Sequence, residues 1–165
     1  MTIAIRPERR SDEATIHALT ASAFADRPYS NGSEPGIIDR LRADGDLSLS
    51  LVAEQDGAIL GHIAFSPVEI TNGAPRWFGL GPVSVRPDEQ GNGIGGDLIR
   101  AGIEVLERDG AKGIVLLGDP AYYSRFDFAP HAGLTYPGLP PEYFQVLLLS
   151  GDWPHGTVRY APAFG

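Results

Sequence analysis

The chain has 165 residues, which fits one domain with its own hydrophobic core, and 0 cysteines, which excludes disulfides, thiolate metal sites and thiol nucleophiles. Its 13 Lys and Arg against 21 Asp and Glu give a formal net charge of −8, so we expect no broad surface for nucleic acid or acidic membranes. The first residues lack the apolar run of a signal peptide, and no stretch is apolar enough to span a bilayer, so a cytoplasmic protein is expected.

The N-terminal part predicts one short strand and two helices. Ile3 and Ile5 alternate with small or charged neighbours, as in a strand. Ser11 is a candidate cap for a first helix whose apolar face falls within residues 16–24. A second helix is expected over residues 34–43.

The middle of the chain predicts an antiparallel meander. Its strands cover residues 48–55, 58–70 and 76–85. Asp56-Gly57 and Asn72-Gly73 separate them, and both pairs favour type I′ turns, which need a positive φ at both central residues.

A strand–loop–helix–strand unit follows the meander. Apolar residues recur at helical spacing over 93–109, and residues 113–118 form a short apolar run typical of a buried strand parallel to 80–85. Asp119 and Pro120 are expected to open a short helix, with Asp119 as its N-cap. This order predicts an α+β fold with a mixed, mostly antiparallel sheet, and excludes a doubly wound fold.

Residues 1–165 are expected to form one domain, with a core over 1–130 and a C-terminal part over 131–165. That part is rich in Pro, Gly and aromatic residues and has one clear apolar segment at 144–149. It could cover the sheet, form a lid over a binding site, or contact a second copy of the chain in a homodimer.

A glycine-rich loop opens the helix over 93–109. Gly91, Gly93, Gly95 and Gly96 carry no side chain that would keep a ligand away. The amide groups at a helix start have no intrahelical partner, and the helix dipole adds partial positive charge. Together they form a site for a phosphate that needs no Lys or Arg. The alternative is that these glycines serve only flexibility or close packing.

The same loop matches the dinucleotide fingerprint Gly-x-Gly-x-x-Gly from Gly91 to Gly96, and Asp119 would then take the place of the ribose-binding acid. Three observations disfavour that interpretation. Residues 86–90 separate the strand from the first glycine, the chain has one parallel crossover, and little chain follows residue 118. The phosphate loop of NTPases is excluded, because Gly-Lys-Ser and Gly-Lys-Thr are absent.

The loop also reads Gln90-x-x-Gly93-x-Gly95 after Val83-Ser-Val85-Arg-Pro87, and Tyr123-Ser-Arg-Phe-Asp-Phe128 follows downstream. In these two motifs the sequence resembles the GNAT superfamily of acetyl-CoA-dependent N-acetyltransferases, over roughly residues 1–130. Gly118-Asp-Pro-Ala-Tyr-Tyr123 is similar to the Gly-Asp-Pro-x-Tyr-Tyr motif of a bacterial subgroup. Two positions depart from the family pattern. Asp127 stands where the family has Gly, and the usual Asn seven residues before the Tyr is missing.

The resemblance implies a twisted sheet with helices on both faces and a V-shaped splay between two parallel central strands. Gly81-Pro82 favours a bulge that would produce this splay. The resemblance further implies acetyl-CoA as co-substrate, held without a metal by the strand before the loop, by the loop itself and by the short helix. The predicted cofactor-binding residues are Val83, Ser84, Val85, Gln90, Gly91, Asn92, Gly93, Ile94, Gly95, Gly96, Asp119, Tyr122 and Tyr123.

By the same resemblance, the protein would transfer an acetyl group to a primary amine by direct attack in a ternary complex. Tyr123 matches the family's general acid, and a phenol with an ordinary pKa near 10 is protonated at pH 7. An N–H near Val83 could face the oxyanion. The base stays open between Glu34, Glu69 and a chain of waters, and Ser66 could lie on the acceptor side. The four histidines have no ligand spacing. The alternative function is a catalytically idle acyl-CoA-binding or sensor module.

Overall fold

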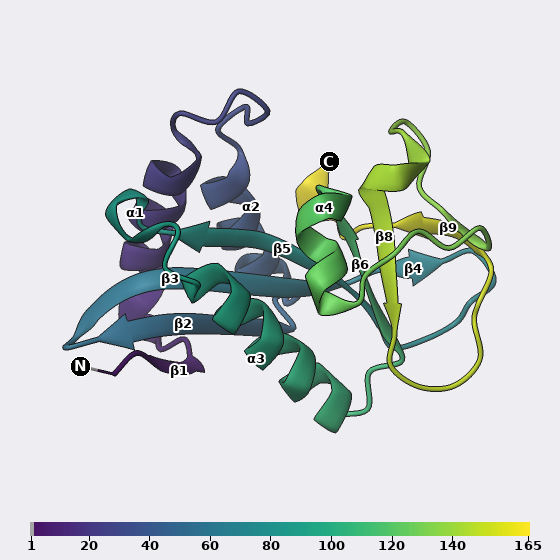
Figure 1. The fold of residues 1–165 in the computed structure, drawn as a ribbon, viewed down its shortest axis with the longest axis horizontal. Helices are drawn as coiled ribbons and strands as arrows, with labels where there is room; N and C mark the ends of the chain where they lie inside the picture. The colour runs from purple at the N-terminus through teal and green to yellow at the C-terminus, as the bar shows by residue number, and fades with distance from the viewer. Residues whose placement is uncertain (1) are drawn as a thin grey trace.

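The computed structural model describes residues 2–165 and contains a six-stranded mixed sheet flanked by helices (Figure 1). Its strand order is β1-β2-β3-β5-β6-β8, in which β5 and β6 run parallel and the other neighbours run antiparallel. The strands are β1 (Ala4–Pro7), β2 (Leu49–Gln55), β3 (Ala58–Pro67), β5 (Trp77–Val85), β6 (Gly113–Leu117) and β8 (Phe144–Leu148). The predicted α+β class with a mixed sheet is confirmed.

Helices pack on the two faces of this sheet. They are α1 (Glu13–Phe24), α2 (Glu34–Asp44), α3 (Ile94–Arg108) and the short α4 (Pro120–Tyr123). Val52 of β2 packs with Ile16 and Ile38 of α1 and α2, while its neighbours Leu51 and Ala53 belong to the larger core beneath α3. This alternation is what a strand buried on both faces requires. In the described residues, no helix combines the length and the apolar character needed to cross a membrane.

The first helix does not start where its sequence suggests. Ser11 lies in a 3-10 turn over Arg10–Asp12, and α1 begins at Glu13. The cap prediction is wrong because Asp12 organises this turn instead. Its Oδ2 accepts from the backbone N of Arg9 at 2.6 Å and from Nη1 of Arg6 at 2.8 Å.

The two predicted hairpin turns have different outcomes. Asp56 and Gly57 have φ angles of 52° and 82°, as a type I′ turn between β2 and β3 requires. At the second turn only Gly73 is left-handed, so the type I′ prediction for Asn72-Gly73 is wrong. The predicted strand 58–70 breaks after Pro67, and its last residues form β4 (Glu69–Ile70), which leaves the main sheet and pairs with β9 (Gly156–Arg159).

The C-terminal part closes the far edge of the sheet. The apolar segment predicted at 144–149 is β8, which pairs with β6. A small second sheet joins β4, β9 and β7 (Leu134–Thr135). Leu134 and Val158 from this part are buried against Trp77 and Val115, so the segment covers the β5–β6 end of the sheet.

The two parallel strands pair over a short distance and then separate. β5 and β6 are in register only from Trp77 with Gly113 to Gly79 with Val115. On its other side, β5 shifts register against β3, because Phe65 pairs with Leu80 but Ile63 pairs with Val83. One extra residue of β5 therefore lies at Gly81-Pro82, which is a bulge. The predicted bulge and splay are confirmed, and they open the space that contains the site.

Candidate active site

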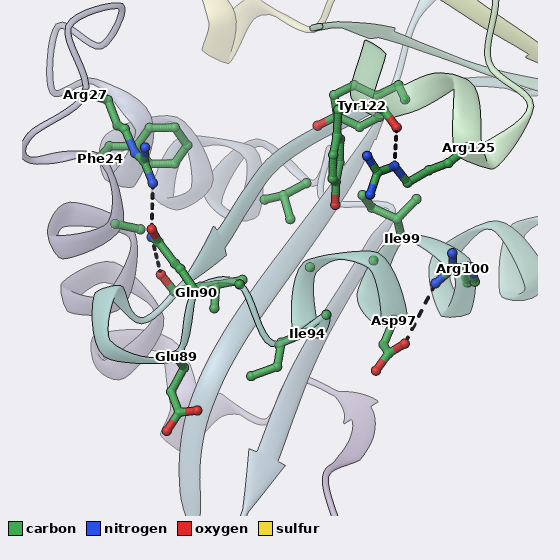
Figure 2. A pocket seen from close by; sticks show the side chains of 18 of the residues that line it. Phe24, Arg27, Glu89, Gln90, Ile94, Asp97, Ile99, Arg100, Tyr122 and Arg125 are labelled. Atoms are coloured by element: carbon green, nitrogen blue, oxygen red, sulfur yellow. Dashed lines mark hydrogen bonds and ion pairs between the residues drawn. The ribbon is translucent and has the colours of Figure 1, made fainter. Parts of the chain in front are cut away.

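A cavity of about 630 Å³ lies where β5 and β6 separate, between the C-terminus of α1, the N-terminus of α3 and α4 (Figure 2). Most of the predicted cofactor-binding residues line it. These are Val83, Val85, Gln90, Gly91, Gly93, Ile94, Gly95, Gly96, Tyr122 and Tyr123.

Three predicted residues have their side chains elsewhere. Ser84 is buried and its hydroxyl donates to Oγ1 of Thr20 at 3.3 Å, because strand alternation turns it away from Val83 and Val85. Asn92 is exposed, with Nδ2 at 3.4 Å from a Glu89 oxygen. Asp119 accepts from the backbone N of Ala121 at 2.9 Å and so caps α4, as its position before Pro120 predicts.

The glycine loop presents backbone amides to the cavity. Gly91 and Gly93 are left-handed, with φ angles of 86° and 85°, and Gly93 is the N-cap of α3. The amide of Asp97 bonds to the carbonyl of Gly93 at 3.0 Å, so the amides of residues 94–96 precede the first helical bond and have no partner within α3. A glycine-lined helix start of this kind fits an anion such as a phosphate.

Gln90 links this loop to the neighbouring strand and to α1. Its Nε2 donates to the carbonyl of Val85 at 3.1 Å, and its Oε1 accepts from Nη2 of Arg27 at 2.6 Å (Figure 2). Arg27 follows α1 and is 63 residues away in sequence. No local pattern around Arg27 indicates this contact, because only the packing of α1 beside β5 creates it.

Three arginines border the cavity, although backbone amides alone can bind a phosphate. They are Arg27, Arg100 and Arg125. The guanidinium carbon of Arg100 lies 4.9 Å from the ring centroid of Phe126, and that of Arg125 lies 4.5 Å from the centroid of Tyr122. In the sequence, Arg125 could be linked to the site only through its position inside the Tyr123–Phe128 motif. For Arg100, helical periodicity predicts a place on α3 but gives no indication that it borders the cavity.

Tyr123 brings a phenol to the same cavity. Its ring packs against Gly118, where a Cβ would lie 2.5 Å from Cε2, and it meets the ring of Phe128 edge-on at a centroid distance of 6.2 Å. Burial raises the pKa of Tyr123 to about 12, and the nearby phenols of Tyr122 and Tyr29 act in the same direction. The phenol is therefore protonated at neutral pH. No other group in residues 2–165 hydrogen-bonds to this hydroxyl, so it is free to donate to a ligand.

The candidate bases lie outside the cavity. Glu34 accepts from the hydroxyl of Ser30 at 2.6 Å, and Glu69 pairs with Arg159 on the second sheet. The hydroxyl of Ser66 is enclosed in the protein without a hydrogen-bond partner. Within residues 2–165, no group of three or more His, Asp or Glu side chains is placed to hold a metal ion.

Asp127, which replaces the usual glycine, does adopt the left-handed conformation, with φ at 71°. Its amide closes the turn on the carbonyl of Ser124 at 3.0 Å. The turn that follows α4 therefore survives the substitution, since Asp tolerates this region better than most residues.

Comparison with known proteins shows which family this chain resembles. Residues 14–128 match the model of the acetyltransferase (GNAT) family. The uncharacterized N-acetyltransferase YhbS of Escherichia coli K12 is 37% identical over 150 residues, which cover 88% of this chain and 89% of that protein. The uncharacterized N-acetyltransferase YjhQ of the same strain is 41% identical over 128 residues, or 75% of this chain and 68% of that protein.

Solved structures agree with these matches. A GNAT family acetyltransferase from Brucella melitensis in complex with acetyl-CoA is 50% identical, with a TM-score of 0.89 over 99% of both chains. YhbS from Escherichia coli in complex with CoA is 35% identical, with a TM-score of 0.88 over 98% of this chain and 91% of that one.

Proposed function

Because this chain belongs to the GNAT family of acetyltransferases, we propose that it transfers the acetyl group of acetyl-CoA to a primary amine by direct attack within a ternary complex. Acetyl-CoA supplies a thioester: the amine nitrogen bonds to its carbonyl carbon, the carbon–sulfur bond breaks, and CoA leaves as the thiol. The observation that supports the proposal is one cavity lined both by the glycine loop before α3 and by Val83 and Val85, which lie on β5 beyond its pairing with β6.

The residues present fit such a ligand at its phosphate end. The amides of residues 94–96 lack partners within α3 and would take the diphosphate, aided by the left-handed glycines before them. A Cβ at residue 95 would stand 3.7 Å from the hydroxyl of Tyr122, so glycine keeps this side of the cavity open.

The strand gap fits the arm that links the diphosphate to the thioester. Pairing between β5 and β6 stops at Gly79, and Val83 and Val85, further along β5, line the cavity. The backbone groups of Val83 and Val85 would hydrogen-bond the amides of the arm, as an added strand would. An N–H near Val83 would stabilise charge on the carbonyl oxygen.

Tyr123 would act as general acid. Its phenol is protonated, lines the cavity and has no protein acceptor within residues 2–165, so it would give its proton to the departing sulfur. We assign no side chain as the base, because Glu34 and Glu69 both have other partners outside the cavity.

The test combines acetyl-CoA with a panel of primary amines and follows thiol release together with the acetylated product. We expect release that depends on both the protein and one class of amine. Calorimetry on the same preparation measures binding of acetyl-CoA. Binding without thiol release from any amine would instead identify an idle acyl-CoA-binding module, and absence of binding would reject the site.

Two narrower predictions go with this proposal. One is membership of the subgroup marked by Gly118 to Tyr123, and the other is a homodimer formed through residues 131–165. Analytical ultracentrifugation tests the homodimer by measuring the mass of the protein in solution.

A further inference from the structure

We propose that Arg100 and Arg125 bind a phosphate monoester, namely the 3′-phosphate on the ribose of CoA, separately from the backbone amides that take the diphosphate. This inference rests on the proposed function, because it concerns another part of the same ligand. If it is right, these two side chains make the protein bind CoA more tightly than dephospho-CoA, which lacks the 3′-phosphate.

Arg100 reaches the start of its own helix because residue 96 is glycine. A Cβ at residue 96 would stand 3.3 Å from Nη1 of Arg100, so the guanidinium lies over the first turn of α3. The face of Phe126 supports it at 4.9 Å. The carboxylate of Asp97 is 3.9 Å away, beyond hydrogen-bond distance, so it leaves the N–H groups of Arg100 available.

Arg125 is held in place without a carboxylate. Its Nε donates to the carbonyl of Tyr122 at 2.8 Å, and its guanidinium lies 4.5 Å over the ring of the same residue. These contacts fix the plane of the guanidinium, and its two terminal nitrogens have no hydrogen bond within residues 2–165. Two parallel N–H donors in a fixed fork match the oxygens of a phosphate.

The two guanidinium groups stand on the same side of the cavity, across from Arg27 and Gln90 (Figure 2). The chain has a net charge of −8, and Arg6, Arg42 and Arg86 each pair with a carboxylate within 3 Å. Arg100 has only a looser ion pair, with Asp97 at 3.9 Å, and Arg125 has no carboxylate partner within residues 2–165.

Beyond these two arginines, a neighbouring hollow carries acidic side chains. Glu104, Glu107 and Asp127 line it, and Arg100 and Arg125 line it as well as the cavity. The cavity also has two carboxylates in its lining, Glu89 and Asp97, but it adds the free amides at the start of α3, so a phosphate would bind more favourably on the cavity side. The arrangement therefore directs an anion towards the start of α3 rather than along its length.

A monoester needs this kind of partner more than a diphosphate does. At pH 7 a phosphate monoester carries a charge of about −1.5 to −2 and three acceptor oxygens. The amides of residues 94–96 offer only partial positive charge to the diphosphate. The amide site has no full positive charge to offer the ribose phosphate. The two guanidinium groups supply two such charges.

The experiment measures the affinity of the full chain for CoA and for dephospho-CoA by calorimetry. We expect CoA to bind about tenfold more tightly or better, since hydrogen bonds to charged groups are strong. Arg100→Gln and Arg125→Gln should each reduce this preference about three- to tenfold, while the affinity for dephospho-CoA stays within about twofold. Arg108→Gln, on the last turn of α3 and outside the cavity, is the matched control and should change neither affinity.

Melting curves show whether each variant is folded, and Arg125→Lys, which retains the charge, should keep part of the preference. Equal affinities of the unmodified protein for the two ligands would overturn this inference and leave the proposed function standing. The inference is also wrong if the variants weaken both ligands equally, because the arginines would then serve the diphosphate. If neither ligand binds, the proposed function fails as well.

Discussion

At the scale of single residues, the proposed role of Tyr123 as general acid makes a sharp kinetic prediction. Tyr123→Phe removes the hydroxyl but keeps the ring that packs on Gly118 and Phe128. We expect kcat for acetyl transfer to fall about 100-fold, the size typical of a lost general acid. The Kd for CoA should stay within about twofold, because in the proposed complex the diphosphate and the arm of the ligand contact other residues. Stopped-flow thiol release and calorimetry measure the two quantities.

The control for this variant is Tyr143→Phe. Tyr143 is 44% exposed and lies outside the cavity, so its hydroxyl should not affect either constant. If Tyr123→Phe turns over as fast as the unmodified protein, another group or water protonates the sulfur. Because burial raises the pKa of Tyr123 to about 12, we expect the rate to show no loss from deprotonation of this phenol between pH 7 and 10.

At the scale of elements, two helices use glycine in opposite ways. Gly36 of α2 is exposed, and a Cβ there would meet nothing within 4 Å. Gly102 of α3 lies against β3, where a Cβ would stand 2.3 Å from Cε2 of Phe65. Gly36→Ala should therefore raise the free energy of unfolding by about 0.5–1 kcal/mol, through better helix propensity. Gly102→Ala should lower it by about 1–3 kcal/mol, because α3 must move off the sheet.

Urea unfolding of the two variants tests this pair, and each serves as the control for the other. If Gly102→Ala leaves the free energy of unfolding unchanged, α3 and Phe65 can adjust to the added methyl group. The close approach of α3 to the sheet would then not limit stability.

The elements also show which parts of the structure sequence patterns can predict. Alternation and apolar runs located the strands, because burial on the faces of a sheet selects those patterns directly. The predictions of a helix cap at Ser11 and of a type I′ turn at Asn72 were wrong for the same reason. Each has the right local chemistry, but a distant partner decides the outcome: Arg6 binds Asp12 beside Ser11, and β9 draws β4 away from the hairpin near Asn72.

The site divides in the same way. The glycine loop and Tyr123 were predictable, since short motifs carry their geometry within a few residues. Arg27 was not, because its contact with Gln90 depends on where α1 ends relative to β5. The orientation of Ser84 follows from strand alternation, but only once the side facing the cavity is known.

At the scale of the whole molecule, one buried histidine couples stability to pH. His62 of β3 is fully buried, with Nε2 at 2.7 Å from the hydroxyl of Ser50, which in turn donates to Glu8 at 2.5 Å. Glu8 also pairs with Arg42 of α2 at 2.9 Å, so the network joins β2 and β3 to a helix. Burial lowers the pKa of His62 to about 4, and the charge of Glu8 opposes this only in part.

The direction of the effect follows from proton binding. In the unfolded chain His62 takes up a proton below about pH 6.5, but in the folded protein it does so only near pH 4, so stability falls as the pH drops between these values. From pH 7 to pH 5 the free energy of unfolding should fall by about 2 kcal/mol through this group. Urea unfolding at several pH values measures this dependence. His62→Gln should lose the part of the fall in unfolding free energy that His62 causes, whereas His155→Gln, at an exposed position, should keep it. Identical pH dependence in the unmodified protein and His62→Gln would show that His62 binds its proton equally well in the folded and unfolded chain, and that its burial is not what sets acid stability.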